Sequence, residues 1–225
     1  MGQFEQLAVG SSAARIYLPD GGDGPGVVVL HPWWGLNADV VAYADRLADA
    51  GFRVIAPDLF AGDVAETIDG AERLSSAAEA NAEGLLEIVL AATDDLAARL
   101  GNGAGIATLG FSFGAGYALW SASRRPSIAA NVLYYGTMTG PSLAKSTATV
   151  LGHFAEDDPY ENDESIGALE EGLSDAGREL TVHRYPGTGH WFAEPSRDAY
   201  VREAADLAFE RTVEFLNDRL GGYSG

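Results

Sequence analysis

The sequence predicts an α/β fold built around a mainly parallel β-sheet. Short apolar segments with strand character alternate with longer segments of helical periodicity along most of the 225 residues. This alternation is typical of βαβ units, in which helices join parallel strands. Residues 27–30 form a continuous apolar run rich in β-branched side chains, as expected for a strand buried on both faces. The length and the 47% of hydrophobic residues suit one domain over residues 1–225.

The amino-terminal half is expected to begin with an antiparallel hairpin and to continue with alternating strands and helices. A cluster of Gly, Pro and Asp predicts the turn after the hairpin. The first helix can be capped by Asn37 or Asp39 and ended by Gly51. Residues 61–81 carry no clear pattern and are expected to form a small helix and a loop near the site. The predicted elements are strands 3–9 and 13–18, turn 19–25, strand 27–30, a helix around 40–48, strand 53–56 and helix 85–100.

The carboxyl-terminal half continues the alternation and ends in a long helix. Each helix is predicted from apolar residues at helical spacing, and each strand from a short apolar run next to Gly or Pro. The predicted elements are strand 106–109, helix 113–123, strands 132–135 and 149–152, helix 165–176, strand 180–185 and helix 199–220. No internal repeat or linker is visible, which agrees with a single domain.

Composition excludes several classes of function. The formal net charge is −19, from 14 Lys and Arg against 33 Asp and Glu. Nucleic acids and anionic membranes bind through basic clusters, so neither is expected as a partner. The chain has no Cys, hence no disulfide, thiol nucleophile or iron–sulfur cluster. The start shows no signal peptide and no apolar run reaches membrane-span length, so a cytoplasmic location is expected. The sequence leaves the oligomeric state open, with a monomer favoured.

A candidate nucleophile is Ser112, in the motif Gly-Phe-Ser-Phe-Gly at residues 110–114. A serine at a sharp strand-to-helix turn needs nearly absent side chains two residues before and after it, which explains Gly110 and Gly114. The predicted strand 106–109 and helix 113–123 supply that setting. The same turn aims the Phe113 N–H at a developing oxyanion.

A serine hydroxyl needs a neighbouring base, and His190 is the candidate. It lies in a Gly-rich loop after the last predicted strand, at the sheet edge where α/β folds keep their sites. His183 lies within a strand and His153 ends one, so both are expected to be structural. His31 is expected to be structural, with bracing of the loop after strand 27–30 as the alternative.

The acid that orients the base is expected on the loop after strand 149–152. Asp157 and Asp158 compete for this role ahead of Glu156 and Glu161. Asp158 precedes Pro159, a position that favours extended or turn geometry. The order Ser112, Asp158, His190 is the chain order of the α/β-hydrolase triad. No metal is expected, because the acidic loop lacks the spacing and Gly of a calcium site.

The sequence resembles the dienelactone hydrolase family of α/β-hydrolases over nearly its whole length. The segments that carry the resemblance are HPWWGLN at 31–37, ADRLA at 44–48, APDLF at 56–60, the Gly-x-Ser-x-Gly motif at 110–114, Asp158-Pro159 and GTGH at 187–190. The resemblance implies about eight strands, no large cap domain and hydrolysis of ester or lactone bonds. It places nucleophile, acid and base at Ser112, Asp158 and His190, and adds the Trp33 N–H to that of Phe113 in an oxyanion hole.

Three positions depart from the family pattern. The best-known members have a cysteine where Ser112 stands and a glutamate where Pro32 stands. Losing both together is coherent, because a hydroxyl needs only its histidine base. Four residues after the base, the type member has an arginine that contacts the substrate carboxylate, whereas this chain has Glu194. That difference, with the net charge, weighs against an anionic substrate; Arg73 or Arg197 are possible substitutes.

Aromatic residues gather at the predicted strand ends, where they can line an apolar pocket or simply pack in the core. They are Trp33, Trp34, Phe111, Phe113, Tyr134, Tyr135, Tyr160, Trp191 and Phe192. We expect Trp34, Trp191 and Tyr160 to contact the substrate. The sequence therefore predicts a serine hydrolase of small esters or lactones that needs no cofactor. The alternatives are a thioesterase or small peptidase on the same triad, or a non-catalytic binding member of the family.

Overall fold

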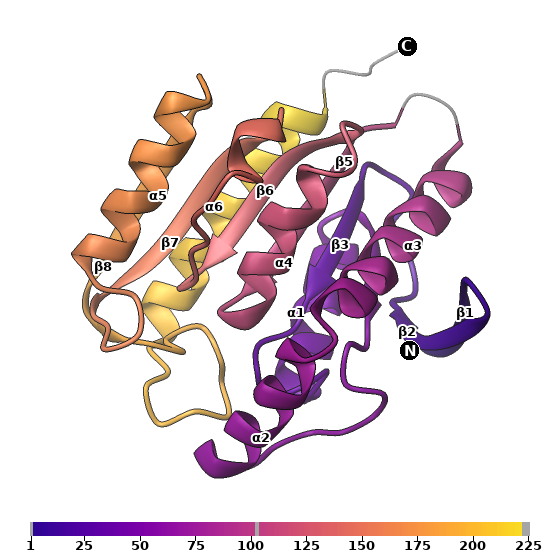
Figure 1. Cartoon of the computed structure of the whole chain (residues 1–225), viewed down its shortest axis with the longest axis horizontal. Coiled ribbons are helices and arrows are strands. Elements are labelled where there is room, and N and C mark those ends of the chain that lie inside the picture. The colour runs from indigo at the N-terminus through magenta and orange to yellow at the C-terminus, as the bar shows by residue number, and fades with distance from the viewer. Residues whose placement is uncertain (1, 102–103, 222–225) are drawn as a thin grey trace.

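An eight-stranded sheet forms the centre of the computed structural model, which describes residues 2–101 and 104–221 (Figure 1). The strands are β1 (Gln3–Val9), β2 (Ser12–Leu18), β3 (Gly26–Leu30), β4 (Arg53–Pro57), β5 (Ile106–Phe111), β6 (Ile128–Tyr134), β7 (Thr149–Asp157) and β8 (Leu180–Gly189). Their order across the sheet is β1-β2-β4-β3-β5-β6-β7-β8. The six strands from β4 to β8 in this order are parallel, and the β1–β2 hairpin joins β4 antiparallel. The predicted α/β class is confirmed. Residues 1, 102–103 and 222–225 of the expected domain lie outside the described residues.

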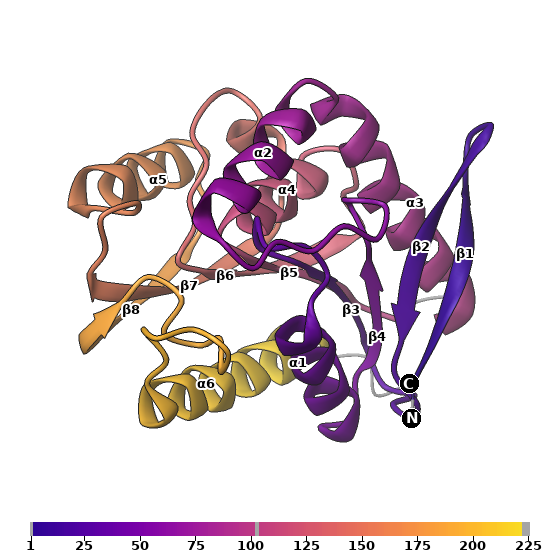
Figure 2. The same ribbon diagram turned by 90° about the horizontal axis from the view of Figure 1, so that it is seen from below.

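Helices cover both faces of the sheet (Figure 2). They are α1 (Ala38–Asp49), α2 (Ile68–Glu79), α3 (Ala82–Leu100), α4 (Phe113–Ala122), α5 (Asp163–Asp175) and α6 (Arg202–Leu220), with a short 3-10 turn, Leu143–Lys145. Helices α1 and α6 lie on one face, and α2 to α5 lie on the other. The described residues contain no second sheet or large cap, as the sequence predicts.

Strand β3 shows how the sequence pattern sets up two cores. All five of its residues are buried, as the continuous apolar run predicts. Val28 and Leu30 belong to the core beneath α3, α4 and α5. Val27 and Val29 belong to the opposite core, beneath α1 and α6. Side chains that alternate along one strand thus anchor helices on both faces, because successive residues of a strand point to opposite sides.

Several elements extend beyond their predicted bounds. β6 begins at Ile128 and not at residue 132, because the polar Asn131 is accommodated inside: its Nδ2 donates to Thr108 Oγ1 at 2.5 Å and to the Ala118 carbonyl at 3.2 Å. β7 and β8 run on to Asp157 and Gly189, which pair after an irregularity in register. His190 therefore follows its strand directly and does not sit in a longer Gly-rich loop.

The segment without a clear sequence pattern, residues 61–81, contains a helix and a loop as expected. Helix α2 occupies Ile68–Glu79, and the Thr67 hydroxyl caps it by accepting from the Gly70 N–H. Asn37, one of the two expected caps of α1, accepts from the Val40 N–H. In the described part of the chain, no helix combines the length and apolarity needed to cross a membrane.

Candidate active site

Ser112 stands at the turn between β5 and α4 with a strained backbone. Its φ and ψ are 46° and −112°, in a region that residues with side chains rarely adopt. A Cβ at Gly110 would lie 2.3 Å from the Gly114 carbonyl oxygen, and one at Gly114 would lie 2.5 Å from the Leu30 carbonyl oxygen. The two glycines therefore let the start of α4 press against the ends of β5 and β3, which is the steric reason for the motif.

A matched pair of glycine variants tests this steric account. Gly114→Ala should destabilise the protein by roughly 1–3 kcal/mol, because its Cβ must displace backbone that cannot move freely. Gly116→Ala should stabilise it by about 0.5–1 kcal/mol, because this helical position has open space and alanine is the better helix former. The nearest atom to a Cβ at Gly116 is 3.9 Å away. Urea unfolding of both variants checks this; equal midpoints would contradict the account.

The structure brings Ser112, His190 and Asp158 together at one edge of the sheet. Ser112 Oγ lies 3.0 Å from His190 Nε2, and His190 Nδ1 lies 2.7 Å from Asp158 Oδ2 and 2.9 Å from Oδ1. The three residues directly follow β5, β8 and β7, so all three stand at carboxyl ends of parallel strands. The side chains of His190 and Asp158 are 4% and 1% exposed. A buried carboxylate, an imidazole and a hydroxyl thus form one hydrogen-bonded chain.

Asp158, and not Asp157, is the acid that contacts the histidine. Its Oδ1 also accepts from the Tyr160 N–H at 2.9 Å and the Glu161 N–H at 3.0 Å, which fixes the carboxylate. Asp157 is exposed at the end of β7. Glu161 instead holds the neighbouring loop, because its carboxylate accepts from the N–H and hydroxyl of Thr137. Within residues 2–101 and 104–221, no group of three or more His, Asp or Glu is placed to hold a metal ion.

The segment predicted to complete an oxyanion hole lies against the start of α4. Phe113 is the first residue of α4, so its N–H has no acceptor within the helix. A Cβ at Gly114 would also lie 2.7 Å from the His31 carbonyl oxygen, which places the chain leading to Trp33 beside the serine turn. His31 braces this segment: its Nδ1 donates to the Pro32 carbonyl and its Nε2 accepts from the Leu59 N–H. Burial lowers the pKa of His31, which keeps the neutral ring this pattern requires.

The three predicted substrate contacts form one aromatic cluster with Trp33. The ring centroids of Trp34 and Trp191 lie 5.3 Å apart, and those of Tyr160 and Trp191 lie 5.5 Å apart. Tyr160 is 49% exposed and packs 4.8 Å from the His190 ring, whereas Trp34 is buried. The cluster therefore runs from solvent at Tyr160 past the histidine to buried Trp34.

The two arginines considered as substitutes for a carboxylate-binding residue differ in their placement. The Arg197 guanidinium lies 3.8 Å from the centroid of the Trp34 ring, in a cation–π contact at the edge of the aromatic cluster. Arg73 is exposed on α2. No contact joins either residue to Ser112, Asp158 or His190.

Glu194 is a buried acid behind the histidine. It is 2% exposed, and its Oε1 accepts from the Tyr135 hydroxyl at 2.9 Å while its Oε2 has no hydrogen-bond partner in the described part of the chain. The Tyr135 ring packs 5.0 Å from the His190 ring. Burial is the main reason that the pKa of Glu194 rises to about 8, although the Tyr135 hydrogen bond and Arg197 oppose the rise. Glu194 is thus protonated near pH 7 and holds the hydroxyl of the tyrosine whose ring packs against His190.

The stability of the protein should fall as the pH rises between about 5 and 8 because of Glu194. The folded-state pKa of about 8 lies above the ordinary glutamate pKa of 4.5, so the folded state holds the proton more tightly across this window. The contribution is complete below pH 4.5 and is lost at roughly 1 kcal/mol per pH unit up to pH 8. Glu194→Gln keeps an acceptor for Tyr135 and cannot ionise. Chemical unfolding at several pH values should show a free energy of unfolding that falls more steeply with pH in the unaltered protein than in Glu194→Gln. The same pH dependence in both proteins would contradict this account of Glu194.

One glycine of the site could not be found from sequence patterns, nor could the backbone strain at two of its aromatic residues. A Cβ at Gly136 would lie 2.5 Å from the Ser112 carbonyl oxygen, so this glycine also shapes the turn. Tyr135 and Trp191 have positive φ values of 38° and 68°, an uncommon strain that clusters at functional sites. The turn at Asp158 did have a local signal in the Asp158-Pro159-Tyr160 run, where the aspartate side chain accepts from a backbone N–H two residues on.

Comparison with known proteins identifies the family of this chain. The sequence profile of the dienelactone hydrolase family matches residues 12–220. "Protein usf" of Aquifex pyrophilus is 28% identical, and the alignment covers 98% of this chain and 100% of the relative. A "probable 2-oxo-3-(5-oxofuran-2-ylidene)propanoate lactonase" of Bradyrhizobium is 30% identical over 88% of this chain and 85% of its own.

Solved structures give the same answer for the fold. The crystal structure of a "putative dienelactone hydrolase" from Klebsiella pneumoniae superposes with a TM-score of 0.85 and covers 99% of both chains. Its sequence identity is 20%, so this likeness shows the shared fold alone. The family match spans most of the chain and rests on the sequence itself. The chain belongs to the dienelactone hydrolase family and is a hydrolase of the α/β-hydrolase fold.

Proposed function

We propose that this protein is a serine hydrolase that cleaves small carboxylic esters or lactones through an acyl-enzyme on Ser112. The observation that carries the proposal is the unbroken chain of contacts from Ser112 Oγ through His190 to Asp158, at 3.0 Å and 2.7 Å. A serine hydroxyl becomes a nucleophile when a neighbouring neutral imidazole takes its proton. Family membership supports the same class of reaction.

The reaction proceeds in two halves. In the first, Ser112 Oγ attacks the substrate carbonyl and His190 Nε2 takes the hydroxyl proton. Asp158 stabilises the imidazolium and keeps the Nδ1 proton directed at its carboxylate. The tetrahedral intermediate collapses, and His190 returns the proton to the leaving alcohol. In the second half, His190 takes a proton from water, which attacks the acyl-enzyme and releases the acid.

The oxyanion of each tetrahedral intermediate is stabilised by the N–H groups of Phe113 and Trp33. The Phe113 N–H is free of helical hydrogen bonding, and it lies at the helix end that carries partial positive charge. Donors fixed in this way act without reorganisation during the reaction and typically contribute a few kcal/mol each.

The surroundings of the triad favour an uncharged substrate with an apolar or aromatic part. Trp34, Trp191 and Tyr160 offer aromatic surface beside His190. Glu194 occupies the position at which the type member holds a carboxylate-binding arginine, and it is buried against Tyr135. Small size follows from the absence, within the described residues, of a cap domain that could enclose a large substrate.

A panel of substrates tests the proposal. Initial rates are measured with p-nitrophenyl acetate, dihydrocoumarin as an aryl lactone, p-nitrophenyl palmitate, an acyl thioester and a peptide p-nitroanilide. The proposal predicts the highest kcat/KM for the acetate or the lactone. Turnover of only the thioester would identify a thioesterase, and turnover of only the peptide would identify a peptidase. Failure to turn over any of them, together with failure to react with a fluorophosphonate, would identify a binding protein.

A further inference from the structure

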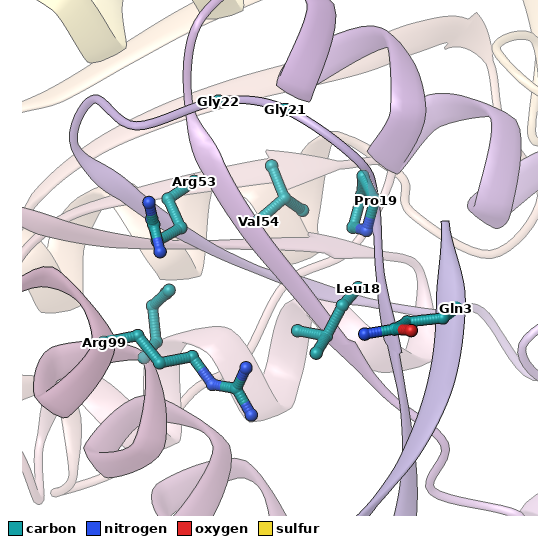
Figure 3. A pocket seen from close by; sticks show the side chains of 9 residues that line it. Gln3, Leu18, Pro19, Gly21, Gly22, Arg53, Val54 and Arg99 are labelled. Carbon is teal, nitrogen blue, oxygen red and sulfur yellow. The ribbon is translucent and has the colours of Figure 1, made fainter. Parts of the chain in front are cut away.

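A cavity lies at the opposite edge of the sheet from the triad. It has a volume of about 180 Å³ and is lined by residues from the β2–β3 loop, the start of β4 and the end of α3 (Figure 3). Arg53 is the first residue of β4, whereas Ser112 follows the last residue of the parallel β5. Six residues of β5 at about 3.3 Å each separate the two edges by roughly 20 Å. The cavity is therefore not part of the active site.

Two guanidinium groups face this cavity in a strongly acidic protein. Figure 3 shows the side chains of Arg53 and Arg99 on the same wall, with Leu18 and Gln3 across from them. The Arg53 side chain makes no hydrogen bond or ion pair with any described residue, and its Nε is buried without a partner there. Arg99 is shared with two acids, because its Nε contacts Asp95 at 2.6 Å and its Nη2 contacts Glu5 at 3.0 Å. Among the residues that the structure describes, no Asp or Glu lines the cavity.

The backbone holds the wall beside Arg53 in a fixed shape. Gly21 and Gly22 both have positive φ, and a Cβ at Gly22 would lie 1.9 Å from the Phe52 carbonyl oxygen. The Arg53 N–H donates to the Pro25 carbonyl at 3.0 Å. The β2–β3 loop therefore packs closely against Phe52 and Arg53 at the start of β4. The cavity is thus present in the protein without a ligand.

An unpaired guanidinium with a buried, unsatisfied N–H calls for an acceptor. A lone buried donor costs free energy that a hydrogen bond to an anion recovers. Guanidinium groups bind phosphate oxygens in pairs of parallel hydrogen bonds, and Arg99 brings a second guanidinium to the same wall, although Asp95 and Glu5 compensate its charge. Leu18, Val54 and Leu96 line the remaining surface with apolar groups. The charge and shape match a phosphoryl group that carries a small organic part.

We propose that the cavity between Arg53 and Arg99 is a binding site for the phosphoryl group of a small molecule, independent of the hydrolase site. Arg53 is the principal ligand because its charge is uncompensated, and Arg99 contributes less because two carboxylates share it. Binding at this site stabilises the fold by linkage, since an anion bound to the native state alone shifts the unfolding equilibrium.

The test measures Tm with increasing inorganic phosphate, against sodium chloride at equal ionic strength. Phosphate should raise Tm by several degrees once its concentration is well above Kd. Arg53→Gln should abolish this rise. Arg202→Gln, which removes an exposed positive charge on α6, should keep it. Glycerol 1-phosphate in place of phosphate separates the two sources: a larger rise identifies a phosphate ester, and an equal rise identifies the free ion.

Measurement on the unaltered protein guards against a variant that fails to fold. In ¹H–¹⁵N spectra, phosphate should shift the Arg53 Nε–H signal and the amide signals of Gly21 and Gly22 in a saturable way. Equal Tm rises in unaltered protein and Arg53→Gln would overturn the proposal. So would saturable shifts confined to residues outside this cavity, or none beyond those caused by sodium chloride.

Discussion

Ser112→Ala is expected to lower kcat for p-nitrophenyl acetate by about 10⁴-fold or more, toward the residual rate that an oxyanion hole alone can supply. The variant removes the one hydroxyl that contacts His190 Nε2. Alanine has a Cβ as serine does and meets the same backbone strain at this position, so the fold and the KM should change little. Steady-state kinetics and circular dichroism of the purified variant check both expectations.

The matched control for this variant is Ser123→Ala. Ser123 stands at the other end of α4, and its hydroxyl donates to the Trp120 carbonyl. It should retain the kcat of the unaltered protein within about twofold, as expected of a substitution away from the reacting groups. A comparable loss in both serine variants would mean that the effect comes from α4 and not from the nucleophile.

Asp158→Asn is expected to lower kcat by up to about 10⁴-fold while leaving the geometry nearly unchanged. Asp158 Oδ1 accepts from two backbone N–H groups, so the asparagine oxygen should keep that place. The amide nitrogen then replaces Oδ2, which lies 2.7 Å from His190 Nδ1. Because an amide NH₂ donates, the ring must carry its proton on Nε2, and it can no longer accept from Ser112.

Asp157→Asn provides the control at the adjacent position. Its side chain is exposed at the end of β7, and the substitution removes the same charge one residue away. It should leave kcat within about twofold of the unaltered protein. The rate of Asp158→Asn should stay low across the pH range, because the defect is the tautomer and not the ionisation. Equal losses of kcat in the two variants would show that negative charge near the site matters and that the orientation of the His190 ring does not.

The parts of the structure that could be predicted are those with local causes. The alternation of elements follows from apolar periodicity, and β3 is buried on both faces as its β-branched run predicts. The serine turn could be predicted because Gly110 and Gly114 meet a steric demand within five residues of chain. The chain order Ser112, Asp158, His190 then predicted that the candidate acid and base lie at the same edge of the sheet as the serine. Their catalytic roles stay a prediction.

The choice between Asp157 and Asp158 could not be made from local pattern. The two residues are chemically equal, and successive side chains of a strand point to opposite sides. What separates them is the end of β7, which depends on the pairing of Asp157 with Gly189 in a strand more than thirty positions away. The run Pro186-Gly187-Thr188-Gly189 is rich in turn residues, so the sequence predicted a loop where β8 continues past an irregularity.

The role of Glu194 depends on burial, which a single sequence does not display. In the sequence, Glu194 was visible only as a departure from the family pattern, and this departure indicated only a different substrate. In the structure it is a buried neutral acid that accepts from Tyr135, whose ring supports His190. Long-range packing of β6 against the segment after β8 creates this contact. The aromatic residues at the strand ends were visible in the sequence, but not which of them share one cluster.

The most direct test of the central claim is intact-mass spectrometry of the protein quenched during turnover of p-nitrophenyl acetate. Acid quenching within the first turnovers should show a fraction of molecules heavier by one acetyl group, and peptide mapping should place that group on Ser112. The Ser112→Ala protein should carry no acetyl group under the same conditions. Turnover with an acetyl group on another residue, or an acetylated fraction that persists in Ser112→Ala, would contradict the acyl-enzyme mechanism on Ser112.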